Sequence, residues 1–265
     1  MGMSRRTRDF SLIKFKELCQ SIVKANYQSI TIQQYLEDKK EKERIPDKIV
    51  LLRHDVDRIP NLALKFAEIE TGLGLQGTYY FRTHSASFKP SLIRKIYHLG
   101  HEIGYHYETL SDAGGDIDLA LDLFTENLTC LREIVPIETI AMHGRPLSPW
   151  DNRQIWNHAS FEKFNLLGEA YLSLDFNEID YFSDTGRTWH PSRHNIKDKA
   201  QNAPRYFLES TDDLIKHINS GRSNHLCILT HPERWPSQTF HWILQSGIDF
   251  SLNLIKDFYS FLQRR

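Results

Sequence analysis

Apolar runs that end abruptly in polar residues recur along this chain. The first run is Ile49-Val50-Leu51-Leu52, and Arg53-His54-Asp55-Val56-Asp57 follows it directly. Short continuous apolar runs of this kind are typical of strands buried on both faces of a parallel sheet. We expect further strands at 77–82, 101–106, 139–142, 169–174, 181–187 and 225–230.

Helical patterns separate these strands. Apolar residues recur at helical spacing after Pro60 and Pro90, and also within 10–25, 116–135, 210–219 and 251–262. Alternation of strands and helices predicts an α/β fold, a parallel sheet with helical crossovers, and about seven strands could close into a (β/α) barrel. We expect 1–46 to be a helical N-terminal extension packed on the barrel, 47–265 to be the barrel domain, and 190–206 to be a long loop.

Composition and charge narrow the function classes. The 265 residues suit one (β/α) barrel, and 40% hydrophobic with 25% charged residues is ordinary for a globular protein. A formal net charge of −1 gives no support for nucleic acid or an acidic membrane as a bulk partner. The three cysteines are scattered, and we find neither an apolar stretch long enough to span a bilayer nor a signal-peptide pattern. We therefore expect a cytoplasmic protein.

Polar residues follow nearly every expected strand. In a parallel sheet the carboxyl ends of the strands share one edge, where α/β proteins place their chemistry. That edge would gather imidazoles, carboxylates and guanidiniums, a set suited to metal-assisted hydrolysis. The residues concerned are Asp55, Asp57, Arg82, His106, Glu108, His143, Arg145, Asp184, Arg187, His231 and Arg234.

Asp55 and Asp57 can divide two roles between them. Residues two apart in an extended chain point the same way, so one carboxylate could bind a metal while the other acts as a base. One Asp and two His around an open position is a ligand set typical of catalytic zinc. In the alternative interpretation, Asp57 and Arg58 cap the following helix and Asp55 pairs with Arg53.

From about residue 48 onward, the motifs resemble those of a known family. His54-Asp55-Val56-Asp57 is similar to the first motif of the polysaccharide deacetylases with the NodB homology domain, carbohydrate esterase family 4. Gly100-His101-Glu102-Ile103-Gly104-Tyr105-His106 closely matches the second motif, and Leu229-Thr230-His231 resembles the last one. His143-Gly144-Arg145-Pro146 is a loose counterpart of the third, so the chain looks like a divergent member.

This resemblance implies a distorted (β/α) barrel and the hydrolysis of N-acetyl or O-acetyl groups on sugars. It implies that Asp55 is the catalytic base and that Arg145 orients it. Asp57 and His106 would bind the metal, and His231 would act as general acid or stabilise the leaving group.

One position departs from the family pattern. The second motif usually has another histidine four residues after the first, as a further metal ligand, and here Leu110 occupies that position. His143 is our first choice for the missing ligand, because it ends the next strand. Glu108 is the second choice, because in an extended chain it points the same way as His106.

These observations lead to one leading hypothesis and two alternatives. The protein is interpreted as a metal-dependent hydrolase that uses a divalent metal, zinc, to remove an acetyl group from an amino sugar or saccharide. The saccharide would be a precursor such as a nucleotide- or lipid-linked sugar. One alternative is a catalytically inactive, carbohydrate-binding barrel, and the other is a hydrolase of non-sugar amides on the same fold. Expected substrate contacts are Arg82, Asp184, Arg187 and Trp235, and Trp150, Trp156 and Trp189 could likewise stack on sugar rings or pack in the core.

Overall fold

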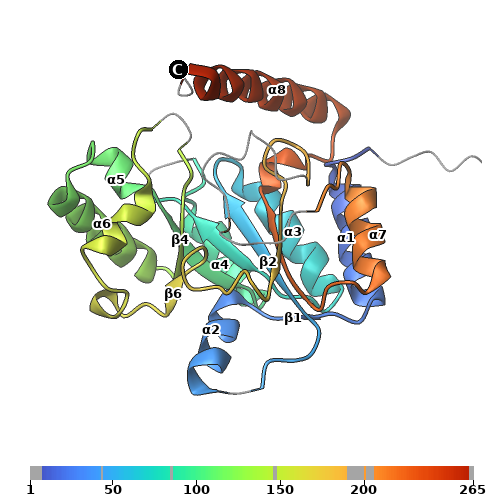
Figure 1. Ribbon diagram of the computed structural model, residues 1–265, viewed down its shortest axis with the longest axis horizontal. Coiled ribbons are helices and arrows are strands. Elements are labelled where there is room, and N and C mark those ends of the chain that lie inside the picture. The colour runs from blue at the N-terminus through green and yellow to red at the C-terminus, as the bar shows by residue number, and fades with distance from the viewer. Residues whose placement is uncertain are drawn as a thin grey trace, which may run out of the picture.

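A curled, all-parallel sheet forms the centre of the protein. The computed structural model describes residues 8–42, 44–83, 86–145, 148–189, 200 and 206–262. Within them, seven strands follow the order β6-β5-β4-β3-β2-β8-β7, and a short strand β1 pairs with the start of β2 (Figure 1). The expected distorted barrel of about seven parallel strands is confirmed, and the described sheet is open between its edge strands β6 and β7.

The strands are short except for the central one. Their bounds are β1 (Gln28–Ser29), β2 (Ile49–Val56), β3 (Thr78–Phe81), β4 (Glu102–Tyr107), β5 (Thr139–Met142), β6 (Gly168–Glu169), β7 (Asp180–Ser183) and β8 (His225–Thr230).

Helices connect and cover these strands. Their bounds are α1 (Leu12–Lys24), α2 (Ile32–Glu41), α3 (Pro60–Gly72), α4 (Pro90–His98), α5 (Thr109–Asp112), α6 (Ile117–Arg132), α7 (Thr211–Ser220) and α8 (Thr239–Leu262), with short 3₁₀ helices η1 (Asn152–Asn157), η2 (Glu162–Phe164) and η3 (Pro232–Arg234).

Strand β2 is buried along its whole length. All eight of its residues are buried, and it pairs in parallel with β3 on one side and β8 on the other. The register places Asp55 beside Tyr80 of β3, and His54 beside Thr230 of β8. This register brings the polar residues that follow β2 and β8 to the same edge of the sheet.

Two expected strands are shorter than predicted. The strand expected at 169–174 ends at Glu169, whose buried carboxylate accepts backbone N–H bonds from Met142, Tyr171 and Leu172 at 2.7–2.9 Å. These bonds draw the chain into a turn. The strand expected at 181–187 ends at Ser183, because the chain turns where Gly186 and Arg187 adopt positive φ. The loop expected at 190–206 lies outside the described residues, apart from 200 and 206.

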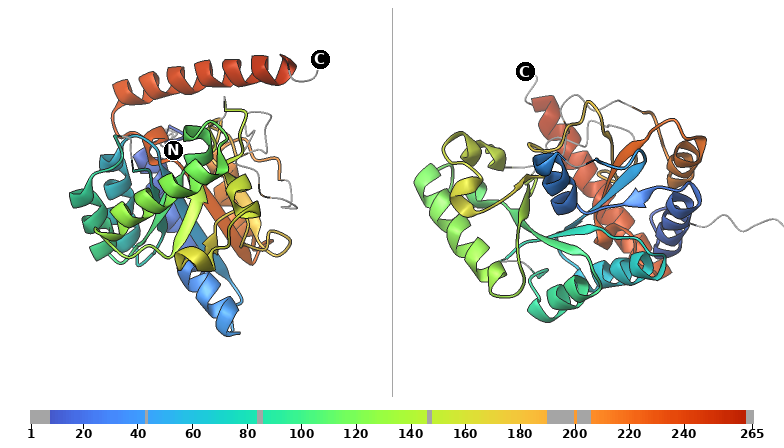
Figure 2. Two further views of the ribbon diagram at one scale, coloured as in Figure 1. Left: turned by 90° about the vertical axis from the view of Figure 1, so that its left-hand side faces the viewer. Right: turned by 90° about the horizontal axis from the view of Figure 1, so that it is seen from below.

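The C-terminal helix is longer than expected. It begins at Thr239 rather than near 251 and passes through Gly247. It lies along one side of the molecule, beside the end of the sheet where β8 runs into η3 (Figures 1 and 2). In the part of the chain that the structure describes, neither this helix nor any other is both long and apolar enough to cross a membrane.

The N-terminal helix α1 contributes to the same core as the barrel. Phe15 is fully buried and stacks on Phe66 of α3, with ring centroids 3.5 Å apart. Its edge also meets Trp235, just after η3. Helix α1 therefore packs against α3, which follows β2, and against the segment after η3, which follows β8.

We predict that Phe15→Ala lowers the free energy of unfolding by about 3–5 kcal/mol, because it leaves a cavity in this core. The matched control is Ile13→Ala on the same helix. Ile13 is 64% exposed, so its replacement should change stability by about 0.5 kcal/mol or less. Urea unfolding of both variants measures the difference. Equal effects would show that α1 is not part of the core.

Candidate active site

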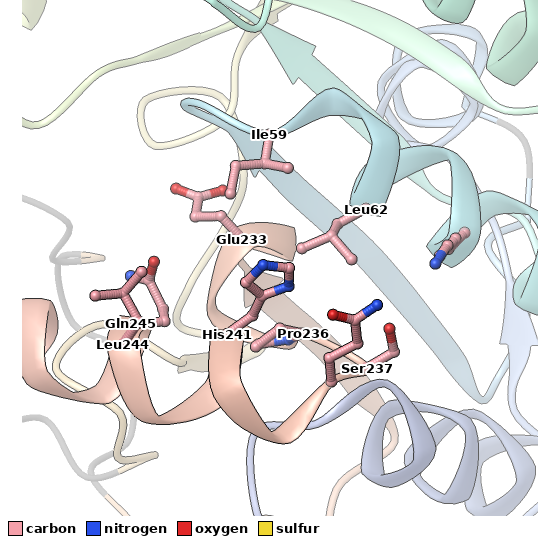
Figure 3. A pocket seen from close by; sticks show the side chains of 10 residues that line it. Ile59, Leu62, Glu233, Pro236, Ser237, His241, Leu244 and Gln245 are labelled. Carbon is pink, nitrogen blue, oxygen red and sulfur yellow. The ribbon is translucent and has the colours of Figure 1, made fainter.

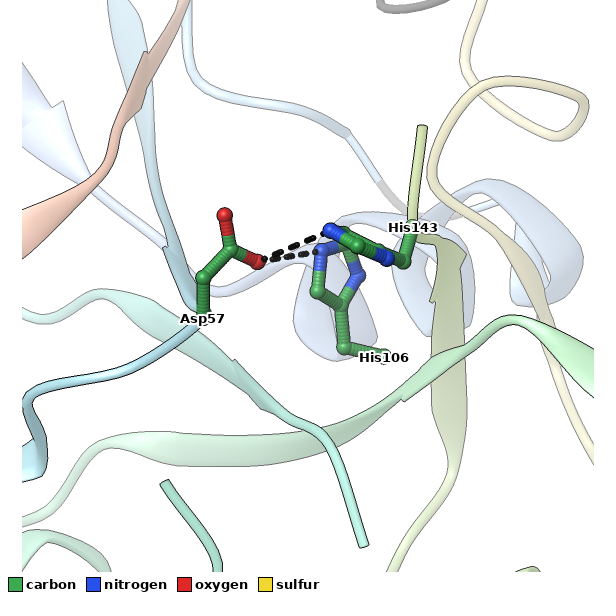
Figure 4. Close-up of side chains that lie close together, drawn as sticks. All are labelled: Asp57, His106 and His143. Carbon is green, nitrogen blue, oxygen red and sulfur yellow. Dashed lines mark ion pairs between the residues drawn. The ribbon is translucent and has the colours of Figure 1, made fainter. Parts of the chain in front are cut away.

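Three of the expected metal ligands converge at the carboxyl edge of the sheet. Asp57 directly follows β2, His106 lies in β4, and His143 directly follows β5. Asp57 Oδ1 lies 3.4 Å from His106 Nε2 and 3.5 Å from His143 Nε2 (Figure 4). One ligand atom from each residue lies within 4.8 Å of the other two. Among the described residues, this group of three is the one whose geometry could hold a metal ion.

Hydrogen bonds determine which nitrogen of each histidine faces the cluster. His106 Nδ1 lies 3.0 Å from the carbonyl oxygen of Ala141, and His143 Nδ1 lies 2.8 Å from Glu108 Oε2. Both partners are acceptors, so each Nδ1 carries the proton. When the ring is neutral, each Nε2 keeps its lone pair on the side that faces Asp57, which is the arrangement that a metal-binding histidine needs.

The donor set fits a divalent metal such as zinc. Donor atoms about 2.0–2.2 Å from a tetrahedral zinc lie roughly 3.3–3.5 Å from one another. The separations of 3.4 and 3.5 Å match that spacing, and they are longer than a normal hydrogen bond. One carboxylate and two imidazoles are also the ligand types that zinc prefers.

Leu110, which stands where the family pattern has a histidine, is part of the hydrophobic core. Its side chain is 1% exposed and packs there from a short helix that lies against α6. His143 is the third member of the cluster, and its role as a ligand stays a prediction. Its backbone N–H bonds to the Tyr107 carbonyl at 2.7 Å, which extends the pairing of β4 with β5 by one residue.

Glu108 supports the cluster from behind His143. Its other oxygen binds the guanidinium of Arg82. Burial alone would raise the pKa of Glu108, but the bond to His143 and the charge of Arg82 lower it to about 2. Glu108 is therefore an ionised carboxylate that orients His143, and Arg82 holds Glu108 in place.

Asp55 is bound by Arg53 on the same strand. Arg53 Nε and Nη2 donate to the two oxygens of Asp55 at 2.9 and 2.7 Å, and both residues are buried. Burial raises the pKa of Asp55, but the charges of Arg53 and His106 lower it below its usual value. The second oxygen of Asp55 lies 3.6 Å from His106 Nε2. Asp55 is therefore an ionised carboxylate next to the cluster.

The pairing of Arg53 with Asp55 contradicts one expectation and agrees with part of the alternative interpretation. We expected Arg145 to orient Asp55. Arg145 instead contacts Asp112 and, at 3.7 Å, Glu108, because it lies beyond β5 on the far side of His143. The pairing of Asp55 with Arg53 was part of the alternative interpretation. The helix cap in that interpretation is not formed, since the residue before α3 is Ile59 and gives no side-chain cap.

His231 is positioned by Asp184 from the neighbouring strand end. Its Nδ1 lies 2.6 Å from Asp184 Oδ1, and its backbone N–H donates to Asp184 Oδ2 at 2.9 Å. Burial and the charge of Arg234 lower the pKa of His231, but Asp184 overrides both and raises it to about 9. His231 is therefore protonated at neutral pH. It also lies near enough to Asp55 and Asp57 to lower their pKa.

The four residues expected to contact the substrate all have partners within the protein. Asp184 is fully buried and also accepts a bond from Trp235 Nε1 at 2.8 Å. Trp235 is itself 0% exposed, so it offers no ring face to a sugar. Arg82 binds Glu108, and Arg187 reaches α8. Of the other tryptophans, Trp189 is buried and Trp150 is 38% exposed.

Sequence reasoning missed Glu233, which lies at the border of the site. Its side chain is 1% exposed, and among the described residues its only charged contact within 4 Å is Arg58 Nε at 3.7 Å. Burial and the nearby charge of Asp57 raise its pKa to about 7. Glu233 also lines a largely apolar cavity of about 280 Å³ between the start of α3 and α8, with Ile59, Leu62 and Leu244 (Figure 3). The only sequence signal was a charged residue two positions after His231.

Comparison with known proteins gives distant likenesses in structure. No protein-family model matches the sequence, and no curated protein matches it. The chain is similar to the Streptococcus pyogenes deacetylase PplD in complex with acetate, with 14% sequence identity and a TM-score of 0.46. The match covers 60% of this chain and 75% of that chain.

Two proteins from Bacillus anthracis are also similar. One is a wild-type pseudoenzyme of carbohydrate esterase family 4, with 14% identity, 79% of this chain and 62% of that chain covered, and a TM-score of 0.44. The other is a family 4 carbohydrate esterase with 11% sequence identity and a TM-score of 0.40. That match covers 95% of this chain and 88% of the esterase chain. The motifs resemble the family to which these two structures belong. The roles of individual residues rest on the geometry described above.

We predict that the purified protein binds about one zinc per chain, and that His143→Ala weakens zinc binding at least about tenfold, because it removes one of three ligands. His98→Ala removes an exposed histidine from α4 and should bind zinc like the original protein. Zinc titration followed by elemental analysis measures both. Unchanged zinc binding in His143→Ala would exclude His143 as a ligand.

Proposed function

We propose that this protein is a metal-dependent hydrolase that removes an acetyl group from an amino sugar or another saccharide. We further propose that it is a divergent member of carbohydrate esterase family 4. One observation carries the proposal: the cluster of Asp57, His106 and His143, which could hold a metal ion, lies close to an ionised carboxylate, Asp55, and to a protonated imidazole, His231. Metal-assisted hydrolysis of an amide or ester uses these three components together.

Asp57, His106 and His143 would hold the metal, which we propose to be zinc. When bound, zinc polarises an acyl carbonyl and lowers the pKa of water to about 7. Glu108 keeps the His143 ring in place, and the Ala141 carbonyl does the same for His106. Both rings are thereby fixed before substrate arrives, so little reorganisation is needed.

Asp55 is proposed as the general base. An ionised carboxylate can accept a proton from the attacking water, and the two bonds from Arg53 fix its orientation. The same bonds lower its pKa and so weaken it as a base. The ion pair therefore holds Asp55 in position and keeps it ionised, but it does not make Asp55 a stronger base.

His231 is proposed as the general acid. Its Nδ1–H is bound to Asp184, so Nε2–H is the proton available to a leaving amine or alkoxide. Asp184 is in turn fixed by Trp235 Nε1 and by Arg234 Nη1. This support gives the imidazole one orientation.

The alternative function is a carbohydrate-binding barrel without catalysis. The observation that favours it is Leu110, which stands where the family pattern has a metal-binding histidine. His143 supplies an imidazole at the cluster from a different strand, and this geometry supports the hydrolase as the better proposal. Metal content distinguishes the two functions.

We predict that Asp55→Asn lowers the turnover number by about 10²–10⁴-fold while zinc remains bound, because the base is lost and the three ligands are not. Asp47→Asn, at an exposed position before β2, is the matched control and should keep full activity. Acetate release from N-acetylglucosamine oligosaccharides, used as probe substrates, gives the rates. Full activity in Asp55→Asn would exclude Asp55 as the base.

We also predict that Asp184→Asn moves the alkaline fall of kcat/KM to lower pH by about one to three units. His231 must be protonated to act as an acid, so activity is present below its pKa and lost above it. Asp184 is the group that raises this pKa to about 9, and the amide lacks the charge that does so. A pH profile of kcat/KM measures the shift.

The control for this profile is Asp118→Asn, which removes one negative charge from an exposed position on α6 and should leave the alkaline limb in place. If Asp184→Asn and Asp118→Asn give the same alkaline limb, His231 does not titrate as the acid.

A further inference from the structure

Helix α8 directs several of its polar side chains toward the protein, the reverse of the usual polarity. Gln245 and Asp249 are 7% and 5% exposed, and Gln245 Nε2 donates to Asp249 at 3.1 Å. Arg187 Nη1 lies 3.5 Å from Asp249 Oδ2, and Asn253 Nδ2 donates to the Gly186 carbonyl at 3.3 Å. The inner side of α8 is thus bound through polar contacts to the turn that follows β7, next to Asp184.

The outer side of α8 is apolar and exposed. We define the outer face of α8 by its seven exposed large apolar side chains, which are Phe240 at 71%, Ile243 at 59%, Leu244 at 54%, Ile248 at 36%, Phe250 at 65%, Leu252 at 38% and Leu254 at 54%. Fifteen such side chains are exposed among the described residues, so nearly half of them lie on this one helix. Single exposed apolar residues are ordinary, but a continuous face of them marks an interaction surface.

Two cations lie on the flank of this face that borders α3. Lys65 is exposed and lines the cavity shared with Leu244, and Arg58 is exposed next to Glu233, which lines the same cavity. The only acidic residue between 239 and 254 is Asp249, which faces inward.

We propose that the outer face of α8 docks on the surface of an anionic lipid bilayer. An amphipathic helix that lies in the plane of a bilayer buries its apolar face at the boundary of headgroups and acyl chains. In this protein the polar face of the helix is bound to the protein rather than to water. The neighbouring cations are attracted to anionic headgroups.

A second copy of the chain fits this face less well. A two-fold symmetric interface brings the same surface of both copies together. Each copy would bring Arg58 and Lys65 to the border of the interface, while the described part of α8 presents no outward acid to meet them. An anionic bilayer supplies the opposite charge.

Sedimentation of the full-length chain with lipid vesicles tests the proposal. The probes are vesicles of phosphatidylcholine alone and vesicles that also contain phosphatidylglycerol. We expect the protein to sediment with the vesicles that contain phosphatidylglycerol, and binding to weaken as salt is added. The triple variant Ile243→Gln, Phe250→Gln, Leu254→Gln should bind at least tenfold more weakly.

The matched control is Ile13→Gln, Leu119→Gln, Leu172→Gln, which removes three similarly exposed apolar residues from other elements and should bind like the original chain. Lys65→Glu should weaken binding to anionic vesicles. Failure of the original chain to sediment with anionic vesicles, or equal binding by the two triple variants, would overturn the proposal. Light scattering that shows a dimer for the original chain and a monomer for the α8 variant, without vesicle binding, would assign the face to a second copy.

Discussion

The buried ion pair between Arg53 and Asp55 is the constraint around which the site is arranged. Both residues lie on β2 in the middle of the sheet, where a charge without a partner would be strongly destabilising. The Arg53 guanidinium also lies 4.2 Å from the ring centre of Tyr171, so the segment after β6 covers the pair. A carboxylate is therefore kept ionised inside the protein, at the strand end that also carries Asp57.

The same principle recurs at the other reactive groups. His231 is oriented by Asp184, which is itself bound by Trp235. His143 is oriented by Glu108. At Asp55 and His231 a buried group of opposite charge fixes both the direction and the protonation state of the side chain, and at His143 the Glu108 carboxylate fixes the direction of the ring. Side chains that are already held in place need little reorganisation during a reaction. The need for such partners also explains why so many strand-end residues are charged and yet buried.

Helix α8 connects this site with the exterior. Its inner side binds the turn after Asp184 through Asp249 and Asn253, while its outer face is apolar. A surface that contacts α8 would therefore lie on the side of the molecule where the carboxyl ends of the strands lie. The reversed polarity is possible because Arg187 and the Gly186 carbonyl supply partners for the inward polar groups.

The sequence by itself determined the strands, the parallel sheet and the edge where the polar residues gather, because these follow from local patterns and from the geometry of parallel strands. It also indicated Asp57, His106 and His143 as neighbours, since each stands at or near a strand's carboxyl end. The choice of Arg53 over Arg145 as the partner of Asp55, and the bond from Asp184 to His231, depended on the tertiary structure. Whether a strand-end side chain faces the site or supports a neighbour depends on contacts between segments far apart in the chain, such as those of Asp184 and His231, which are 47 positions apart. The direction of the apolar face of α8 was likewise decided by long-range polar contacts, which helical periodicity does not reveal.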